Sequence, residues 1–190
     1  MKEHELHNYK LVLQYEGIRY NGWQKQKNQE NTIQEVVENA VFDGTGERVE
    51  VIGSGRTDAG THAMGQVANV KLGQDLEPER LMDNINKHLP SDIKILECEK
   101  VDNRFHARLN AKAKTYMYTL CVGKKPDVFN RRTVLHYCAD LDVNAMKKAA
   151  EYLKGEHDFM SFCSNKRTKK STVRKIYDIE IIKDGDEISF

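Results

Sequence analysis

The first hundred residues contain six predicted elements whose order few folds accommodate. Strands are predicted over 9–15, 49–52, 66–72 and 92–98, where apolar and β-branched residues alternate or cluster. Helices are predicted from residue 33 to the residue before Gly44 and from residue 78 until Leu89-Pro90. The resulting order of strand, helix, strand, strand, helix, strand is that of the split βαβ, or ferredoxin-like, arrangement.

Both helices carry start signals. Thr32 and Glu35 have the spacing of a capping box, in which the threonine hydroxyl accepts a hydrogen bond from the first turn. Pro78 opens the second helix, and Glu79 places negative charge in its first turn, where the helix dipole favours it. These local signals support the element order independently of the apolar pattern.

The second half begins the same pattern without completing it. Strands are predicted over 115–122 and 172–182, with a helix over 142–153 and a loop over 156–159 between them. Residues 187–190 are predicted to start one more strand. We therefore expect an α+β protein of two ferredoxin-like (RRM-like) lobes, 1–104 and 105–190, whose antiparallel sheets form a central cleft. The second lobe is expected to be incomplete.

The loop that joins the strands over 49–52 and 66–72 is the candidate site. Glycines at 53, 55 and 60 allow tight turns and close approach of another molecule, and Asp58 follows Arg56 and Thr57. An ordinary hairpin turn does not need this Arg-Thr-Asp cluster. A phosphate-binding loop is excluded, because no Gly-Lys-Ser/Thr ending and no helix start follow. A polar loop between two strands is a common place for a functional site.

Charge and composition constrain the function less than this loop does. The chain has 30 Lys+Arg and 29 Asp+Glu residues, so its net charge of +1 gives no indication of a nucleic-acid partner. Its basic residues nevertheless cluster, for example over 104–114 and 166–170, although a single cluster is more often a solvated face. No apolar run approaches the roughly 18 residues that span a bilayer, so we expect a cytoplasmic protein without membrane contact. The four cysteines form no Cys-x-x-Cys pair, and no metal site is predicted.

Residues 55–60, with His62 and Ala63, resemble the signature of the TruA family of tRNA pseudouridine synthases. Further matches occur in the family's order along nearly the whole chain. These matching segments are 22–24, 84–93, 105–118, 155–159 and 172–174.

The resemblance implies isomerisation of uridine to pseudouridine at positions 38 to 40 of the tRNA anticodon stem-loop. It also implies a homodimer and no metal or organic cofactor. Asp58 matches the family's catalytic aspartate, which would act as a nucleophile or as a base. Arg174 would pair with this carboxylate, and Tyr116 would stack on the target base and accept or relay a proton.

The same resemblance implies a set of RNA contacts, in which Arg56 would fill the space that the flipped nucleotide leaves. The expected contacts are Arg56, Thr57, His62, Arg108 and His157. His157 also has a plainer interpretation, because a lone histidine is more often a structural hydrogen-bonding group than a metal ligand. Likewise, Trp23 is more often a core anchor than a stacking surface, Tyr116 a core residue, and Arg174 a surface residue of a strand.

Two other functions stay open. The family pattern normally continues for several dozen residues beyond the point that Phe190 matches, so a catalytically impaired paralogue that binds RNA is one alternative. A structural ferredoxin-like domain without an RNA role is the other. Binding of tRNA at low salt would separate this last interpretation from the first two.

Overall fold

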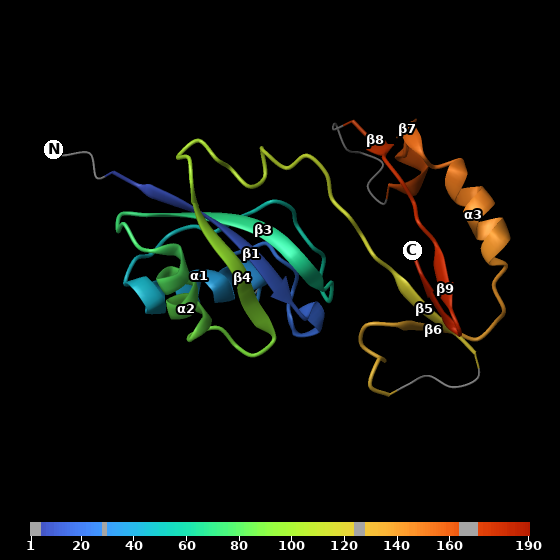
Figure 1. Ribbon diagram of the computed structural model, residues 1–190, viewed down its shortest axis with the longest axis horizontal. Helices are drawn as coiled ribbons and strands as arrows, with labels where there is room; N and C mark the ends of the chain where they lie inside the picture. The colour runs from blue at the N-terminus through green and yellow to red at the C-terminus, as the bar shows by residue number, and fades with distance from the viewer. Residues whose placement is uncertain (1–4, 28–29, 124–127, 164–170) are drawn as a thin grey trace. The chain divides into compact units, whose positions relative to one another are not determined.

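The computed structural model describes residues 5–27, 30–123, 128–163 and 171–190. The chain divides into two compact units, Met1–Lys114 and Thr115–Phe190 (Figure 1). Each unit has a hydrophobic core of its own.

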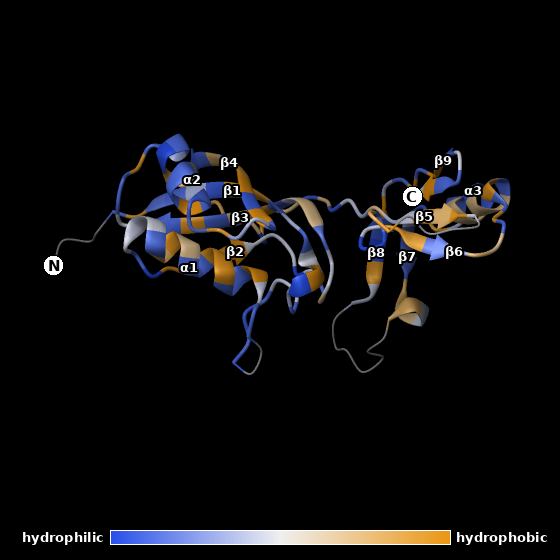
Figure 2. Ribbon diagram, turned by 90° about the horizontal axis from the view of Figure 1, so that it is seen from below, coloured by the Kyte–Doolittle hydropathy of each residue, from blue (hydrophilic) through white to orange (hydrophobic). Residues whose placement is uncertain are grey.

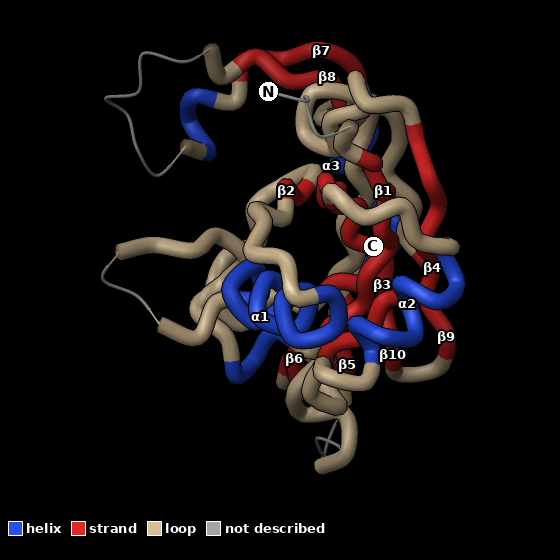
Figure 3. The backbone as a smooth tube through the Cα atoms, turned by 90° about the vertical axis from the view of Figure 1, so that its left-hand side faces the viewer, coloured by secondary structure: helices blue, strands red, loops and turns tan. Residues whose placement is uncertain are grey.

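The described part of the first unit forms a four-stranded antiparallel sheet, two α-helices and a short 3-10 helix, Gly17–Arg19. Its elements are β1 (His7–Tyr15), α1 (Ile33–Thr45), β2 (Ile52–Gly53), β3 (Ala63–Leu72), α2 (Pro78–Asn86) and β4 (Ile93–Val101). The strands lie in the order β2-β3-β1-β4, so β3 and β1 are the central strands and β2 and β4 lie at the edges. Figures 1 and 3 show α1 and α2 side by side. The order of elements predicted for this half is confirmed.

The core of the first unit lies between the sheet and the helices. Along β1, Tyr9, Leu11 and Leu13 are fully buried while the residues between them are less so, as expected for a strand with one covered face. Helix α1 contributes Ile33, Val37 and Val41 at four-residue spacing. Figure 2 shows the corresponding alternation of hydrophobic and hydrophilic residues along these elements.

The start of α1 was predicted correctly, whereas its end was not. Thr32 Oγ1 accepts a hydrogen bond from the backbone N–H of Glu35 at 3.4 Å, which confirms the predicted N-cap. The helix does not stop before Gly44, because it continues to Thr45 and ends at Gly46, whose φ is +79°. Gly44 serves packing instead: a Cβ at this position would lie 3.1 Å from the Asn84 backbone in α2. Gly44 therefore allows the close approach of α2, and Gly46 caps the helix.

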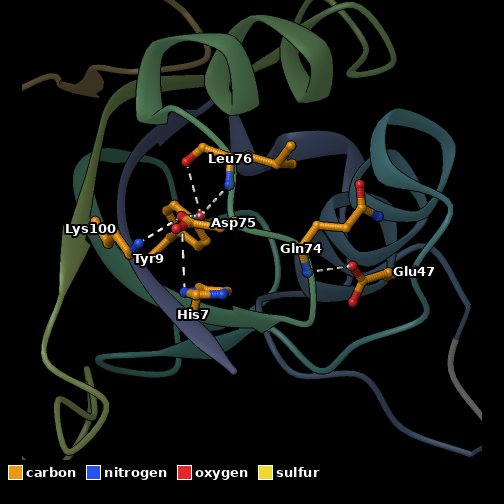
Figure 4. A network of polar contacts seen from close by, with 7 residues as sticks. All are labelled: His7, Tyr9, Glu47, Gln74, Asp75, Leu76 and Lys100. Carbon is orange, nitrogen blue, oxygen red and sulfur yellow. Dashed lines mark hydrogen bonds and ion pairs between the residues drawn. The ribbon is translucent and has the colours of Figure 1, made fainter. Parts of the chain in front are cut away.

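A polar network fastens the start of β1 to the segment that enters α2 (Figure 4). The Tyr9 hydroxyl donates to the Leu76 carbonyl at 2.9 Å and accepts from the Leu76 N–H at 2.8 Å. Lys100 Nζ, from β4, donates to Asp75 Oδ1 at 2.6 Å, and His7 Nδ1 lies 3.9 Å from the same oxygen. The hydrogen bond from Lys100 is the main cause that lowers the pKa of the Asp75 carboxyl below its ordinary value.

Among its described residues, the second unit contains a mixed sheet, a separate strand pair, one α-helix and a short 3-10 helix, Met160–Phe162. Its elements are β5 (Thr119–Val122), β6 (Leu135–Tyr137), α3 (Val143–Glu151), β7 (Gly155–Asp158), β8 (Val173–Ile176), β9 (Ile182–Asp184) and β10 (Glu187–Ser189). The sheet order is β6-β5-β10-β9, and β7 pairs with β8 antiparallel. Because β5 and β6 are parallel, the expectation of a purely antiparallel sheet is wrong for this unit. Val122, Ala150, Ile181 and Ile188 form the buried core. The protein as a whole is a mixed α+β protein.

The predicted elements of the second unit are confirmed only in part. The helix is confirmed, and Asp142 Oδ1 accepts from the Ala145 N–H at its start. The predicted loop over 156–159 is wrong, because Gly155–Asp158 pairs with β8. The predicted strand over 172–182 is interrupted after Ile176, that over 115–122 begins only at Thr119, and β6 was not predicted. Short polar strands such as β7 depend on their pairing partner, which a local pattern does not contain.

Candidate active site

The first half of the loop between β2 and β3 extends the strand pairing. The Ser54 N–H donates to the Val67 carbonyl at 2.7 Å, and Gln66 Nε2 donates to the Gly55 carbonyl at 2.6 Å. The Ser54 hydroxyl and Gln66 Oε1 lie 3.1 Å apart. The backbone is therefore held up to the residue that precedes Arg56.

Thr57 is the anchor at the middle of the loop. Its hydroxyl hydrogen-bonds to the Tyr15 hydroxyl at 2.9 Å, and its carbonyl accepts from the Trp23 N–H at 3.0 Å. Gly22 has a φ of +79°, and a Cβ there would lie 2.6 Å from the Thr57 carbonyl oxygen, so this contact requires a glycine. Trp23 is 2% exposed and packs near Tyr15, which makes it the core anchor of this region and not a stacking surface.

Asp58 follows directly on the anchored residue. Its carbonyl accepts from the Thr61 N–H at 3.1 Å, and the Gly60 N–H donates to the Tyr20 carbonyl at 3.2 Å. The side chain of Asp58 is exposed, and no other described residue forms a hydrogen bond or ion pair with its carboxylate. The loop thus presents a carboxylate from a backbone held on both sides, which leaves the carboxylate oxygens available to a substrate.

His62 holds the far end of the loop. Its Nδ1 accepts from the Gly17 N–H at 3.3 Å. Gly17 approaches the loop so closely that a Cβ on it would lie 1.9 Å from the Thr61 carbonyl oxygen. The segment 15–23 therefore supports the loop from Thr57 to His62.

Arg56 and Arg108 line one hollow of about 220 Å³ beside the loop. His106, Gln24 and the backbone of Gly55 line it too, together with the carboxylate-bearing Glu50. Two guanidinium groups and an imidazole around one hollow suit the oxygens of a phosphate or of a base edge. Arg56 and Arg108 are 52 positions apart in the sequence, and the fold of the first unit brings them together.

Two buried asparagines hold the segment that carries Arg108. Asn8 Nδ2 donates to the Asp102 and Phe105 carbonyls at 3.0 and 2.9 Å. Asn69 Nδ2 donates to Asn8 Oδ1 at 3.1 Å, and Asn69 Oδ1 accepts from the Ala107 N–H at 2.8 Å. Both asparagines are 1% exposed. This pair was not predicted from the sequence, although asparagine is uncommon inside apolar strands and its presence there was the available signal.

Three further site candidates lie in the second unit. His157 on β7 and Arg174 on β8 are register partners, so the strand pair brings them together. His157 Nε2 hydrogen-bonds to the Lys154 carbonyl at 2.7 Å, and Arg174 Nη1 donates to the carbonyls of Ser171 and Val173 at 2.8 and 2.7 Å. Tyr116 precedes β5 and is 65% exposed, so it is not a core residue of this unit.

Neither a metal site nor a membrane span emerges from the parts of the chain that the structure describes. In these parts, no three His, Cys, Asp or Glu side chains gather as a metal-binding group. No helix among the same residues has both the length and the hydropathy that crossing a bilayer requires. No disulfide bond joins any of the four cysteines, all of which lie in the described parts.

A family model and the similar proteins all carry the description tRNA pseudouridine synthase. A family model described as tRNA pseudouridine synthase matches residues 11–110 and 149–190. The chain is 43% identical over 180 residues to tRNA pseudouridine synthase A 2 of Bacillus cereus, which covers 95% of this chain and 74% of that protein. It is 45% identical over 176 residues to tRNA pseudouridine synthase A of Bacillus sp. strain KSM-64, with 93% and 72% covered. The corresponding protein of Acetivibrio thermocellus is 40% identical over 185 residues, with 97% and 75% covered.

The family match includes the loop with Asp58 and the strand with Arg174, and the relatives align over almost the whole chain. Identity of this degree over this length shows common family membership. The chain therefore belongs to the TruA family of tRNA pseudouridine synthases.

Proposed function

We propose that this chain isomerises uridine to pseudouridine at positions 38 to 40 of the tRNA anticodon stem-loop, with Asp58 as the catalytic carboxylate. The observation that carries the proposal is the exposed carboxylate of Asp58 on a loop held from Ser54 to His62. A catalytic group needs a fixed backbone and a reactive atom that other side chains do not occupy.

The reaction balances without a co-reactant. The N1–C1′ bond of uridine breaks, the base turns in the site, and C5 bonds to C1′. The C5 proton leaves to a base, and N1 gains a proton, so substrate and product are isomers. Asp58 would assist bond breakage as a nucleophile or as a base. Tyr116 would stack on the base and carry a proton, while Arg174 would keep the Asp58 carboxylate ionised and oriented.

In this proposal, residues of both units bind the RNA. Arg56, Thr57 and His62 lie in the catalytic loop, and Arg108 lines the adjoining hollow. His157 shares the β7–β8 pair with Arg174. In the first unit, Thr57 and His62 also tie the loop to Tyr15 and Gly17 through hydrogen bonds, so their substitution would disturb both the loop and the RNA contact.

We also propose that the enzyme consists of two ferredoxin-like lobes that enclose a cleft and that it works as a cytoplasmic homodimer. For the first lobe, the strand order β2-β3-β1-β4 with its two intervening helices supports the proposal. Measurement of the molar mass by light scattering would test the dimer: a monomer at assay concentration contradicts it.

The direct test is pseudouridine formation on an unmodified tRNA transcript. The wild-type chain should convert uridines at positions 38 to 40 and no others, as mapped by pseudouridine-specific chemical labelling. A transcript with cytidines at these three positions should stay unmodified. Modification elsewhere in the tRNA would contradict the anticodon assignment. Binding without modification would favour the catalytically impaired RNA-binding protein.

A further inference from the structure

Arg56 is the end of a chain of side-chain hydrogen bonds that begins inside helix α1. Arg56 Nε donates to Gln24 Oε1 at 3.1 Å, and Gln24 Nε2 donates to Gln34 Oε1 at 2.7 Å. Gln34 Nε2 in turn donates to Glu38 Oε1 at 2.9 Å. We call Gln24, Gln34 and Glu38 the amide relay.

The inner end of the amide relay is fixed. Gln34 is 4% exposed, and the Glu38 side chain is 12% exposed. Glu38 Oε1 also accepts from the Val51 N–H at 3.2 Å, and Lys25 Nζ lies 3.1 Å from Glu38 Oε2. The carboxylate is thus held by a backbone donor from the neighbouring segment and by an ammonium group.

The groups at the two ends, Glu38 and Arg56, fix the orientation of the Gln34 and Gln24 side-chain amides. An ionised carboxylate only accepts hydrogen bonds, so the Gln34 amide must turn its NH₂ group to Glu38. The Gln34 oxygen then faces the other way, where the Lys25 N–H also donates to it at 3.0 Å. The Gln24 NH₂ group must face that oxygen, and the Gln24 oxygen consequently faces Arg56, whose guanidinium only donates. A reversed amide at either glutamine would place two donors or two acceptors together.

The relay leaves the outer edge of Arg56 available. Its Nε–H is taken by Gln24, whereas its two terminal nitrogens have no hydrogen-bond partner among the described residues. Two parallel N–H groups on a fixed guanidinium match two oxygens of a phosphate or one polar edge of a base. Gln24, Gln34 and Arg56 all line the 220 Å³ hollow that Arg108 also lines.

We propose that Gln24, Gln34 and Glu38 are positioning residues that orient the Arg56 guanidinium for RNA beside the catalytic loop. None of the three needs to touch RNA in this role, because each acts through the next member of the relay. The inference rests on the proposed function for its RNA ligand. The hydrogen bonds that define it can be tested without any reaction.

The first test is spectroscopic and uses the free protein. In wild type, exchange of the Arg56 Nε–H with water should be slow relative to other exposed arginines, as measured by ¹⁵N NMR. Gln24→Met should make it at least about tenfold faster, since the acceptor is lost. Gln14→Met is the matched control: Gln14 is exposed on β1, so Arg56 exchange should not change. Equal Arg56 exchange in wild type and Gln24→Met would overturn the relay.

The second test is a double-mutant cycle between Gln34 and Arg56. Gln34→Met should lower kcat/KM for pseudouridine formation by about tenfold, the order expected for one hydrogen bond to a charged group. In an Arg56→Ala background the same change should cost less than about twofold, because its target is gone. A full tenfold loss in both backgrounds would mean that Gln34 acts through the fold and not through Arg56.

Two outcomes are kept apart by this design. If Gln34→Met does not fold, as judged by circular dichroism, Gln24→Met replaces it in the cycle, because it leaves the Gln34–Glu38 bond in place. If wild type forms no pseudouridine, the proposed function fails. The Arg56 exchange measurement then decides on the relay alone, with slow exchange that Gln24→Met accelerates as support and unchanged exchange as refutation.

Discussion

Asn69→Ala should detach the segment that carries His106 and Arg108 from the first sheet. The substitution removes the donor to Asn8 Oδ1 and the acceptor of the Ala107 N–H, and both of these groups belong to buried residues. A buried polar group left without its partner costs about 1–3 kcal/mol. Two such groups give a loss of about 3 kcal/mol in the free energy of unfolding of the first unit.

This loss corresponds to a melting temperature lower by about 10 °C, since about 4 °C is expected per kcal/mol for a unit of this size. Thermal unfolding followed by circular dichroism gives the global value. Hydrogen exchange of the Ala107 amide reports the local stability of this segment, and this amide should become unprotected in the variant. Asn103→Ala is the matched control, because Asn103 is exposed in the same segment.

Neutral surface substitutions change the melting temperature by up to about 2 °C. A variant that melts within this range of wild type and keeps the Ala107 amide protected would contradict the prediction. A lower melting temperature with the Ala107 amide still protected would assign the stability loss to another part of the unit. Either result would show that the asparagine pair does not hold the segment.

Three further predictions concern stability. Gly17→Ala should destabilise the first unit by about 2 kcal/mol in urea unfolding, because the new methyl group meets the Thr61 carbonyl oxygen; unchanged stability would contradict the close contact. Thr32→Ala should cost about 1 kcal/mol through loss of the N-cap, in the same assay, whereas Thr32→Ser should cost less. Lys100→Met should lower the melting temperature at neutral pH. Because the pKa of Asp75 is lowered in the folded protein, the stabilisation is present above the ordinary carboxyl pKa and is lost as the pH falls. The difference from wild type should therefore shrink below about pH 4, and a constant difference would exclude the pair as its source.

Local signals in the sequence were sufficient to predict most of the first unit. The alternation along β1, the Thr32 cap and the proline at the start of α2 each depend on residues within one turn or one strand. The glycine-rich loop could be recognised as a candidate site for the same reason. Its residues are contiguous, and apolar runs flank it in the sequence, although the strand predicted over 49–52 forms only at Ile52–Gly53.

Features that depend on distant partners could not be predicted in this way. Strand β7 is polar and forms because Val173–Ile176 pairs with it, and β6 lies parallel to β5 across a long connection. The role of Gly44 depends on the approach of α2. The asparagine pair and the amide relay likewise join residues that neither spacing nor composition relates.

The most direct test of the central claim is the single-turnover rate of pseudouridine formation by Asp58→Asn. The variant keeps the size of the side chain and removes its charge and basicity. The rate should fall by about a thousandfold or more, while tRNA affinity stays within about threefold of wild type. Asp43→Asn makes the same chemical change at an exposed position of α1 and should react at the wild-type rate. A rate for Asp58→Asn close to that of wild type would contradict the assignment of Asp58 as the catalytic carboxylate.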